Sequence, residues 1–598
     1  MAADYQAPVK DMRFVLDTVV DLDRIGELDG FETASRDTVD QILDEAAKFA
    51  GTVLAPINHD GDRQGARLVN GVVRMPDGFA DCYRQYVDAG WGSVTASPDH
   101  GGMGLPWSLN VALNEMWQAA NMSLADGWML TQGAIEALEA HGSAEQKAIY
   151  LPKLVTGEWS GTMNLTESGA GSDVGALRTK AEPDNGSWRI TGTKIFITHG
   201  DQDMSDNVIH LVLARTPGAP PGTKGISLFL VPKRLVDDDG RLGPHNDLRV
   251  VSLEHKLGHL ASPTAMMSYG DDGGALGGLI GGENQGMACM FTMMNNARLN
   301  VAVQGLSIAD RAYQAARHWA RERIQGTDIG GRGHEPVPII RHPDVRRMLM
   351  DMKSHTEAMR ALCYSAAAAV DLARHHPDPM MRARHHGYLE LITPVAKAWC
   401  TDQGFEMASL GVQVHGGMGY IEEAGAAQYL RDARITMIYE GTNGIQALDL
   451  VRRKLRQDGG QAAGRLIADM RATVAALGAE RGGALAAIRD RLAPAVDALD
   501  QATNWIRDTF ADDPVAGAAA ATPYCRMMGF TVGGWLLAQG ARAAAARLAV
   551  ANGDTGFHEA KIQTARYFAE QHLPPAAALL GPITHAREIV MAVAEDQL

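Results

Sequence analysis

The stretch Arg431-Asp-Ala-Arg-Ile-Thr-Met-Ile-Tyr-Glu-Gly-Thr-Asn-Gly-Ile-Gln446 is centred on a single acidic residue, Glu440. Glu440 follows the apolar pair Met437-Ile438. A carboxylate with apolar neighbours is a candidate general base, because desolvation raises its pKa towards the working pH. Gly441 allows a ligand to approach the backbone closely, and the hydroxyl of Thr442 can hydrogen-bond that ligand. Taken alone, the pattern is more typical of a solvated carboxylate at the end of a helix or strand.

The composition around this stretch is that of a large globular protein. At 598 residues the chain is long for one core, so we expect several domains. Hydrophobic residues make up 46% and charged residues 21%, as in ordinary globular proteins. The net charge of −16 disfavours binding to a polyphosphate backbone, so nucleic acid is not an expected partner.

The five cysteines are scattered and form no CxxC pair, which predicts reduced, buried thiols and no structural metal site. The opening Met1-Ala-Ala-Asp-Tyr-Gln6 lacks the features of a signal or transit peptide. No apolar run reaches the roughly 18 residues of a membrane span, and the nearest, Met528–Ala538, is interrupted by Gly533-Gly534. We therefore expect a cytoplasmic protein with no integral membrane segment.

Hydrophobic periodicity predicts a helical domain over residues 1–158. Thr38–Ala50 has apolar residues at helical spacing and Gly51 after it as a stop. Asn110–Leu138 is a second helical stretch, expected to break near Gly127. Ser97–Leu105 is a loop by its proline and glycine content.

The period changes to that of strands over residues 159–282, which predicts a β domain. Trp188–Thr198, Val208–Ala214 and Ile226–Val231 are apolar or alternating over strand length. The segment Met163–Val174 is a glycine-rich turn flanked by hydroxyl side chains. Such a turn suits a flat polar ring, because backbone amides can reach the ring's carbonyl and nitrogen atoms.

Helical patterns return over residues 283–456, beginning with Gly286–Ala320. Gln457–Gly460 is a linker by composition, and residues 460–598 are an alanine-rich helical tail without a catalytic motif. The expected fold is therefore mainly α with a central β domain. The expected domains are 1–158, 159–282, 283–456 and 460–598.

Gln413-Val-His-Gly-Gly-Met-Gly-Tyr420 contains adjacent glycines whose backbone N–H groups could cradle a phosphate. On its own, such a cluster between helices indicates only a turn. The segment Arg321-Glu-Arg-Ile-Gln-Gly326 contains Arg323. The several N–H donors of a guanidinium group suit a pyrophosphate better than a single ammonium group does.

Taken in order, these motifs resemble those of the acyl-CoA dehydrogenase family over roughly residues 40–455. The resemblance implies a helical N-terminal domain, a β-barrel-like middle domain and a four-helix bundle. The tail is similar to the extra C-terminal helical domain of the longer members. It also implies a homodimer that binds FAD between the β domain and the bundle, with a second subunit completing each FAD site.

The resemblance also assigns roles to individual residues. Glu440 corresponds to the catalytic base, and Phe196 corresponds to an aromatic that covers one face of the flavin. The other residues implied to contact FAD are Met163, Leu165, Thr166, Thr198, Arg323, Gln413, Gly416, Gly417 and Thr442. Those implied to contact the substrate are Ser172, Arg298 and Tyr439. For Arg298, a salt bridge on a helix surface is an equally good interpretation.

The chain also departs from the family pattern. Ile324-Gln325 replaces Lys-Thr, Gly330–Pro338 has the character of an insertion, and Gly444 stands where many members have glutamine. One hydrogen bond to FAD is therefore expected to be missing or supplied elsewhere.

The implied activity is α,β-dehydrogenation of an acyl-CoA to the trans-2-enoyl-CoA, with electrons passed to an electron-transferring flavoprotein. The alternatives are an acyl-CoA oxidase that uses oxygen, a non-catalytic flavoprotein that binds DNA, and a structural scaffold. Short, long, branched and sulfur-containing acyl groups all remain open as substrates. The tail is similar both to the very-long-chain type and to the type that acts on 3-methylmercaptopropionyl-CoA, and Tyr5–Phe14 favours the latter.

Overall fold

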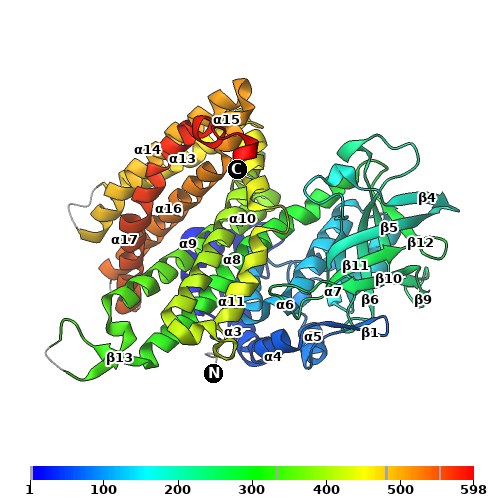
Figure 1. Ribbon diagram of the computed structural model, residues 1–598, viewed down its shortest axis with the longest axis horizontal. Helices are drawn as coiled ribbons and strands as arrows, with labels where there is room; N and C mark the ends of the chain where they lie inside the picture. The colour runs from blue at the N-terminus through cyan, green and yellow to red at the C-terminus, as the bar shows by residue number, and fades with distance from the viewer. Residues whose placement is uncertain (1–4, 332–333, 479–482, 551–553) are drawn as a thin grey trace. The chain divides into compact units, whose positions relative to one another are not determined.

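The computed structural model describes residues 5–331, 334–478, 483–550 and 554–598 (Figure 1). The chain forms two compact units that alternate along the sequence. The bundle unit comprises Met1–Ala47, Pro106–Ala119 and Val301–Leu598, and the sheet unit comprises Lys48–Leu105 and Ala120–Asn300. Two long helices, α6 (Trp107–His141) and α8 (Gly286–Glu322), each contribute residues to both units.

The sheet unit is built on an eight-stranded sheet with the strand order β10-β11-β5-β12-β7-β6-β3, in which β4 also pairs with β5. Its strands are β3 (Trp159–Asn164), β4 (Lys180–Asp184), β5 (Ser187–Thr198), β6 (Asn207–Ala214), β7 (Ser227–Pro232), β10 (Leu248–Leu253), β11 (Thr264–Tyr269) and β12 (Ala275–Ile280). Within this sheet β3 and β6 pair in parallel, and the other pairings are antiparallel. The structure confirms the three strands predicted at 188–198, 208–214 and 226–231.

The strand β6 shows why the sequence of this sheet contains a continuous apolar run. Side chains alternate between the two faces of a strand. In β6, Ile209, Leu211 and Leu213 enter one apolar core together with residues of α6, α7 (Ala144–Thr156) and α8. Val212 and Ala214 enter a second core on the other side. Both faces are therefore buried.

Shorter elements complete the sheet unit. They are α4 (Asn58–Gln64), α5 (Phe79–Asp88), the hairpin of β1 (Arg67–Val69) and β2 (Val72–Arg74), and the hairpin of β8 (Arg234–Val236) and β9 (Leu242–His245). The start of α7 is fixed by a capping box, in which Ser143 and Gln146 satisfy each other's backbone N–H groups.

Two predicted helix boundaries were wrong, and both errors involve glycine. The helix α6 breaks at Asn121 (φ −156°, ψ 88°), whose side chain accepts from Leu124 N, and it does not break at Gly127. Gly127 is small for a packing reason, because a Cβ there would lie 3.1 Å from the His199 ring. Likewise α3 (Arg36–Phe49) continues into a π-helical turn, Ala50–Leu54, so Gly51 does not end it. Glycine ends a helix when it adopts a left-handed conformation, and Gly51 does not.

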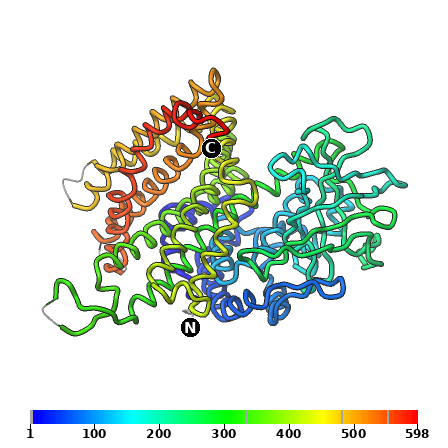
Figure 2. Tube along the Cα trace, in the orientation of Figure 1, coloured from blue at the N-terminus to red at the C-terminus, as the bar shows by residue number. Residues whose placement is uncertain are grey.

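In its described residues the bundle unit is mainly helical, as the trace in Figure 2 shows, and it contains the hairpin of β13 (Ile324–Thr327) and β14 (Pro336–Pro338). Its early helices are α1 (Val9–Val15) and α2 (Leu22–Gly26), and its central helices are α9 (Pro343–His375), α10 (Pro379–His415), α11 (Ala426–Ala433) and α12 (Asn443–Asp449). The hairpin includes the insertion predicted at Gly330–Pro338, of which residues 332–333 lie outside the described ranges.

The C-terminal helices pack on the central helices through α16, which contacts both α9 and α10. They are α13 (Gln461–Leu477), α14 (Gly483–Asp512), α15 (Pro514–Ala519), α16 (Ala521–Ala549), α17 (Thr555–Ala578), α18 (Leu580–Thr584) and α19 (Ala586–Val590). At Gly529 a Cβ would lie 2.3 Å from the Trp399 side chain, and at Gly534 it would lie 2.8 Å from Leu573. The glycines in α16 therefore allow close helix packing.

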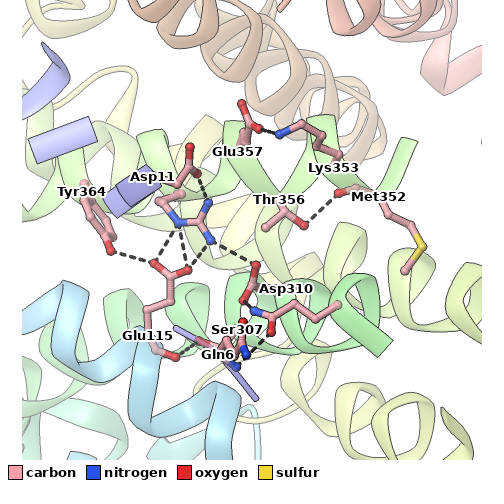
Figure 3. Close-up of polar contacts among 12 residues, drawn as sticks. Gln6, Asp11, Glu115, Ser307, Asp310, Met352, Lys353, Thr356, Glu357 and Tyr364 are labelled. Carbon is pink, nitrogen blue, oxygen red and sulfur yellow. Dashed lines mark hydrogen bonds and ion pairs between the residues drawn. The ribbon is translucent and has the colours of Figure 1, made fainter. Parts of the chain in front are cut away.

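A buried charge network ties the bundle unit together (Figure 3). The Arg360 guanidinium donates to Glu115 at 2.6 and 2.9 Å, lies 3.3 Å from Asp310, and also pairs with Asp11. Tyr364 donates to the same Glu115 carboxylate at 2.7 Å. Burial raises the pKa of both Glu115 and Asp310, against the opposing effect of Arg360. One arginine therefore joins α1, α6, α8 and α9.

The prediction that the cysteines are buried is confirmed, and all five are free. Within the described ranges, no helix is long and apolar enough to cross a membrane.

Candidate active site

Glu440 lies in a tight turn between two helical segments of the bundle unit. A 3-10 turn ends at Met437, and α12 begins at Asn443. Glu440 itself has φ +56°, and Gly441 after it has φ +85°. Left-handed backbone is unfavourable for a residue with a Cβ and occurs mostly at functional or strained turns. The side chain of Thr442 caps α12 by accepting from Ile445 N at 3.3 Å.

A buried lysine supports this turn from behind. Lys397 of α10 is fully buried, and its Nζ donates to Gly441 O and to Asn443 Oδ1, each at 2.9 Å. Asn443 Nδ2 in turn donates to Asp402 Oδ1 at 2.7 Å. Burial raises the pKa of Asp402. Gln446 Nε2 adds a bond to Glu440 O at 3.3 Å, so the carbonyls of both Glu440 and Gly441 are held.

Sequence reasoning did not find Lys397 or Asn443. The available signal is a lysine within an otherwise apolar helical segment, Ile392–Cys400, where a solvated lysine is not expected.

The neighbouring candidates are placed as follows. The Tyr439 hydroxyl donates to Gln304 Oε1 in the same unit. This bond fixes the tyrosine ring of the residue that precedes Glu440 in the sequence. In the sheet unit, Arg298 is only 8% exposed, and its guanidinium lies 5.9 Å from the centre of the Phe291 ring. A surface salt bridge is therefore the wrong interpretation of Arg298.

The residues predicted to contact the flavin ring lie on β3, β5 and the loop after β3. Met163 is buried in an apolar core, and Leu165 packs against that core. Thr166 O accepts from Ile195 N at 2.9 Å, and the Thr162 hydroxyl donates to Thr198 O at 2.7 Å. The strand β5 and the loop are therefore directly bonded. Ser172 lies further along the loop and is exposed.

Phe196 is presented to solvent by an irregularity in β5. On β11, Ala265 pairs with Ile197 and Met267 pairs with Lys194, so β5 has two residues where β11 has one. Such a β-bulge re-aims a side chain. Phe196 sits in the bulge with φ +58°, and 58% of the residue is exposed. A large apolar side chain held outward in strained backbone is suited to cover a flat ring.

The second group of cofactor candidates lies in the bundle unit. Gln413 lies in the last turn of α10, and Gly416 (φ +64°) and Gly417 follow that helix in a 3-10 turn. A Cβ at Gly416 or Gly417 would meet no atom within 4 Å, so open space lies over these backbone groups. Arg323, just before β13, is exposed. Backbone N–H groups and a guanidinium are donors that suit phosphate oxygens, so the residues present fit a dinucleotide such as FAD.

His415 beside these glycines is not a catalytic acid. It stacks on Trp319, and its Nδ1 lies 2.7 Å from Gly411 O. Burial lowers its pKa, so the ring is neutral. The role of His415 is therefore packing.

The sequence matches four domain families. These are "Acyl-CoA dehydrogenase, N-terminal domain" over residues 36–158, "Acyl-CoA dehydrogenase, middle domain" over 162–271, "Acyl-CoA dehydrogenase, C-terminal domain" over 284–455, and "Acetyl-CoA dehydrogenase C-terminal like" over 466–594.

Individual relatives match over most of their length. The 3-methylmercaptopropionyl-CoA dehydrogenase of Ruegeria pomeroyi is 47% identical, covering 97% of this chain and 98% of the relative. A butyryl-CoA dehydrogenase of Syntrophomonas wolfei is 38% identical, covering 77% of each chain. The crystal structure of Caenorhabditis elegans ACDH-11 in complex with C11-CoA matches with a TM-score of 0.75 over 99% of this chain and 96% of that one, and at 21% identity it shows the fold. The chain belongs to the acyl-CoA dehydrogenase family of FAD-dependent enzymes.

Proposed function

We propose that Glu440 takes the α-proton of an acyl-CoA thioester and that the product is the trans-2-enoyl-CoA. The observation that carries this proposal is the turn itself. Glu440 is held in left-handed backbone, half-buried, with the adjacent carbonyl of Gly441 fixed by Lys397. A general base must be placed within hydrogen-bond reach of its proton, and a rigid turn supplies that placement.

The rest of the chemistry follows from the groups around the base. The Glu440 N–H donates to the thioester oxygen and stabilises the negative charge that develops as the α-proton leaves. Tyr439, Arg298 and Ser172 contact the substrate. When bound, FAD supplies the two-electron acceptor that takes the β-hydrogen as hydride.

FAD contacts are assigned to two groups of residues. Met163, Leu165, Thr166, Phe196, Thr198 and Thr442 hold the cofactor within one subunit. Arg323, Gln413, Gly416 and Gly417 hold it from a second copy, which requires a homodimer. Exposed apolar residues next to these glycines support such a contact, since Met418 is 44% exposed and Tyr420 88%.

The proposed substrate is 3-methylmercaptopropionyl-CoA, with fatty acyl-CoA as the alternative. The 47% identity to a dehydrogenase of that name supports the first, and the butyryl-CoA relative supports a short acyl chain. The proposed electron acceptor is an electron-transferring flavoprotein. We also propose that the four segments 1–158, 159–282, 283–456 and 460–598 are the domains. The five reduced cysteines favour the cytoplasm.

The test is an anaerobic panel of acyl-CoA thioesters, in which flavin absorbance is followed after mixing. 3-Methylmercaptopropionyl-CoA should bleach the flavin fastest, followed by butyryl-CoA, with long-chain thioesters slowest. Faster bleaching by long-chain thioesters would overturn the substrate assignment, and no bleaching by any thioester would overturn the function.

A second measurement separates the electron acceptors. Turnover should require an electron-transferring flavoprotein and form little hydrogen peroxide in air. Hydrogen peroxide formed in equal amount to the substrate consumed, without an acceptor protein, would identify an acyl-CoA oxidase.

A further inference from the structure

A buried ion pair lies directly behind the loop assigned to the flavin ring. Lys194 of β5 has no exposed side-chain surface, and its Nζ lies 2.9 Å from Glu167 Oε1. The same Nζ donates to the main-chain oxygen of Leu165 at 3.0 Å. One ammonium group therefore joins β5 to the loop at two points.

Both the carboxylate and the backbone of Glu167 are hydrogen-bonded by residues that follow it in the sequence. Its carboxylate accepts from the Thr179 hydroxyl at 2.6 Å, from Thr179 N at 3.0 Å and from Arg178 N at 2.7 Å. Its backbone also exchanges hydrogen bonds with Ala170, which closes the turn. Burial alone would raise the pKa of Glu167, but Lys194 and these donors outweigh it and lower the pKa. Glu167 is therefore an ionised anchor for Lys194.

The bond to Leu165 matters because of peptide geometry. In a trans peptide unit the C=O and the N–H point in opposite directions. Fixing Leu165 O on one side therefore aims the Thr166 N–H to the other side. The next carbonyl, Thr166 O, is also held by β5, through Ile195 N.

We propose that Lys194, anchored by Glu167, is a positioning residue that orients the Leu165–Thr166 peptide for binding FAD. This inference rests on the proposed position of the flavin beside residues 163–166. Lys194 does not touch the substrate or the reacting atoms. It acts through the peptide that it holds.

The test compares three variants of the full-length protein by two readouts, the dissociation constant for FAD and the melting temperature of the apoprotein. Lys194→Met leaves the buried Glu167 carboxylate without its cation, so both FAD affinity and stability should fall. The FAD dissociation constant should rise at least about tenfold, as expected when a hydrogen bond to a charged group is lost. Arg249→Met removes an exposed ion pair with Asp271 in the same sheet, and should leave both readouts near wild type.

The deciding variant is the double substitution Lys194→Met with Glu167→Gln. It leaves no unpaired buried charge, so the melting temperature should recover towards wild type. The FAD affinity should stay low, because Leu165 O still has no donor. Recovery of both readouts together would show that the pair only stabilises the fold and would overturn the proposal. If wild-type protein binds no FAD, the proposed function fails instead, so the two failures are distinguishable.

Discussion

Two turns, one in each unit, are built in the same way but are supported by different partners. In the sheet unit Phe196 has φ +58°, and in the bundle unit Glu440 has φ +56°. Close to each, a fully buried lysine donates to a backbone carbonyl, Lys194 to Leu165 O and Lys397 to Gly441 O. In the bundle unit the lysine therefore holds the residue after Glu440, whereas in the sheet unit it holds the loop that is bonded to the strand carrying Phe196.

The difference lies in what else the two lysines bind. Lys194 pairs directly with a carboxylate, Glu167, whereas Lys397 donates to the neutral Asn443 amide oxygen. The carboxylate of Asp402 accepts from Asn443 in the second network. A direct ion pair makes the Lys194 network sensitive to loss of either charge, while Lys397 is linked to Asp402 through Asn443 and through its charge, which acts against the burial that raises the pKa of Asp402.

The largest expected difference is in stability. Lys194→Met should lower the free energy of unfolding by about 3 kcal/mol, because it strands a buried carboxylate. Lys397→Met should lower it by about 1 kcal/mol, because it removes a donor from Gly441 O and Asn443 Oδ1. Chemical denaturation of the two apoproteins measures both values. A larger loss for Lys397→Met would contradict the distinction between the two networks.

The effect on kcat should show the reverse order, with a larger loss for Lys397→Met than for Lys194→Met. Lys397→Met should reduce kcat about a hundredfold while FAD remains bound, because a small displacement of the base costs that much. Lys353→Met is a matched control, since it removes a lysine that pairs with Glu357 elsewhere in the bundle unit. Equal losses of kcat in the two variants would show that Lys397 has no special role at the turn.

Much of the fold and of the candidate site could be predicted from the sequence, but the two lysine networks could not. Strand and helix periods predicted β5, β6, β7 and α8, and the Glu440 turn stood out by its own residues. The lysine networks could not be predicted, because their partners are distant in sequence. Lys397 and Gly441 are 44 residues apart, and Lys194 and Glu167 are 27 apart.

A similar limit explains the wrong helix boundary in α6. Gly127 was expected to break α6. Instead, the absence of a side chain at Gly127 leaves room for the ring of His199, which lies 72 residues later in the sequence. The break at Asn121 depends on a local cap to Leu124 N, which the apolar pattern conceals. Packing against a distant residue explains Gly127, a local cap explains the break at Asn121, and hydrophobic periodicity reports neither.

Strain at the two turns can be tested at Phe196. Phe196→Asn should raise the free energy of unfolding by about 1 kcal/mol, because asparagine tolerates left-handed backbone better. Thr191→Asn is the control on the same strand, at an exposed position without positive φ. If Phe196→Asn brings no gain over the control, the turn is not strained in solution.

The smallest expected effect is a dependence on pH in the sheet unit. Burial lowers the pKa of Lys194 to about 8, against the opposing effect of Glu167. Opposite Lys194 on β11 stands Met267, and Arg178 and Thr179 offer only uncharged donors to this pair, so Glu167 is the charged group that faces it. Below pH 8 the ammonium pairs with Glu167, and above it the charge is lost.

The dissociation constant for FAD should therefore rise about threefold as the pH increases through 8, since a neutral amine makes the weaker hydrogen bond. Titration of the apoprotein with FAD between pH 7 and pH 9 measures it. The same step in the Lys194→Met and Glu167→Gln double variant would assign the effect to another group.

The most direct test of the whole account is the rate of flavin bleaching by Glu440→Gln under anaerobic conditions. The variant keeps the shape of the side chain, so it should bind FAD like wild type. Without a base it should bleach at least about a thousandfold more slowly with 3-methylmercaptopropionyl-CoA or butyryl-CoA. Glu559→Gln, an exposed position on α17, should bleach at the wild-type rate. Bleaching of Glu440→Gln at a rate close to wild type would contradict the assignment of Glu440 as the base.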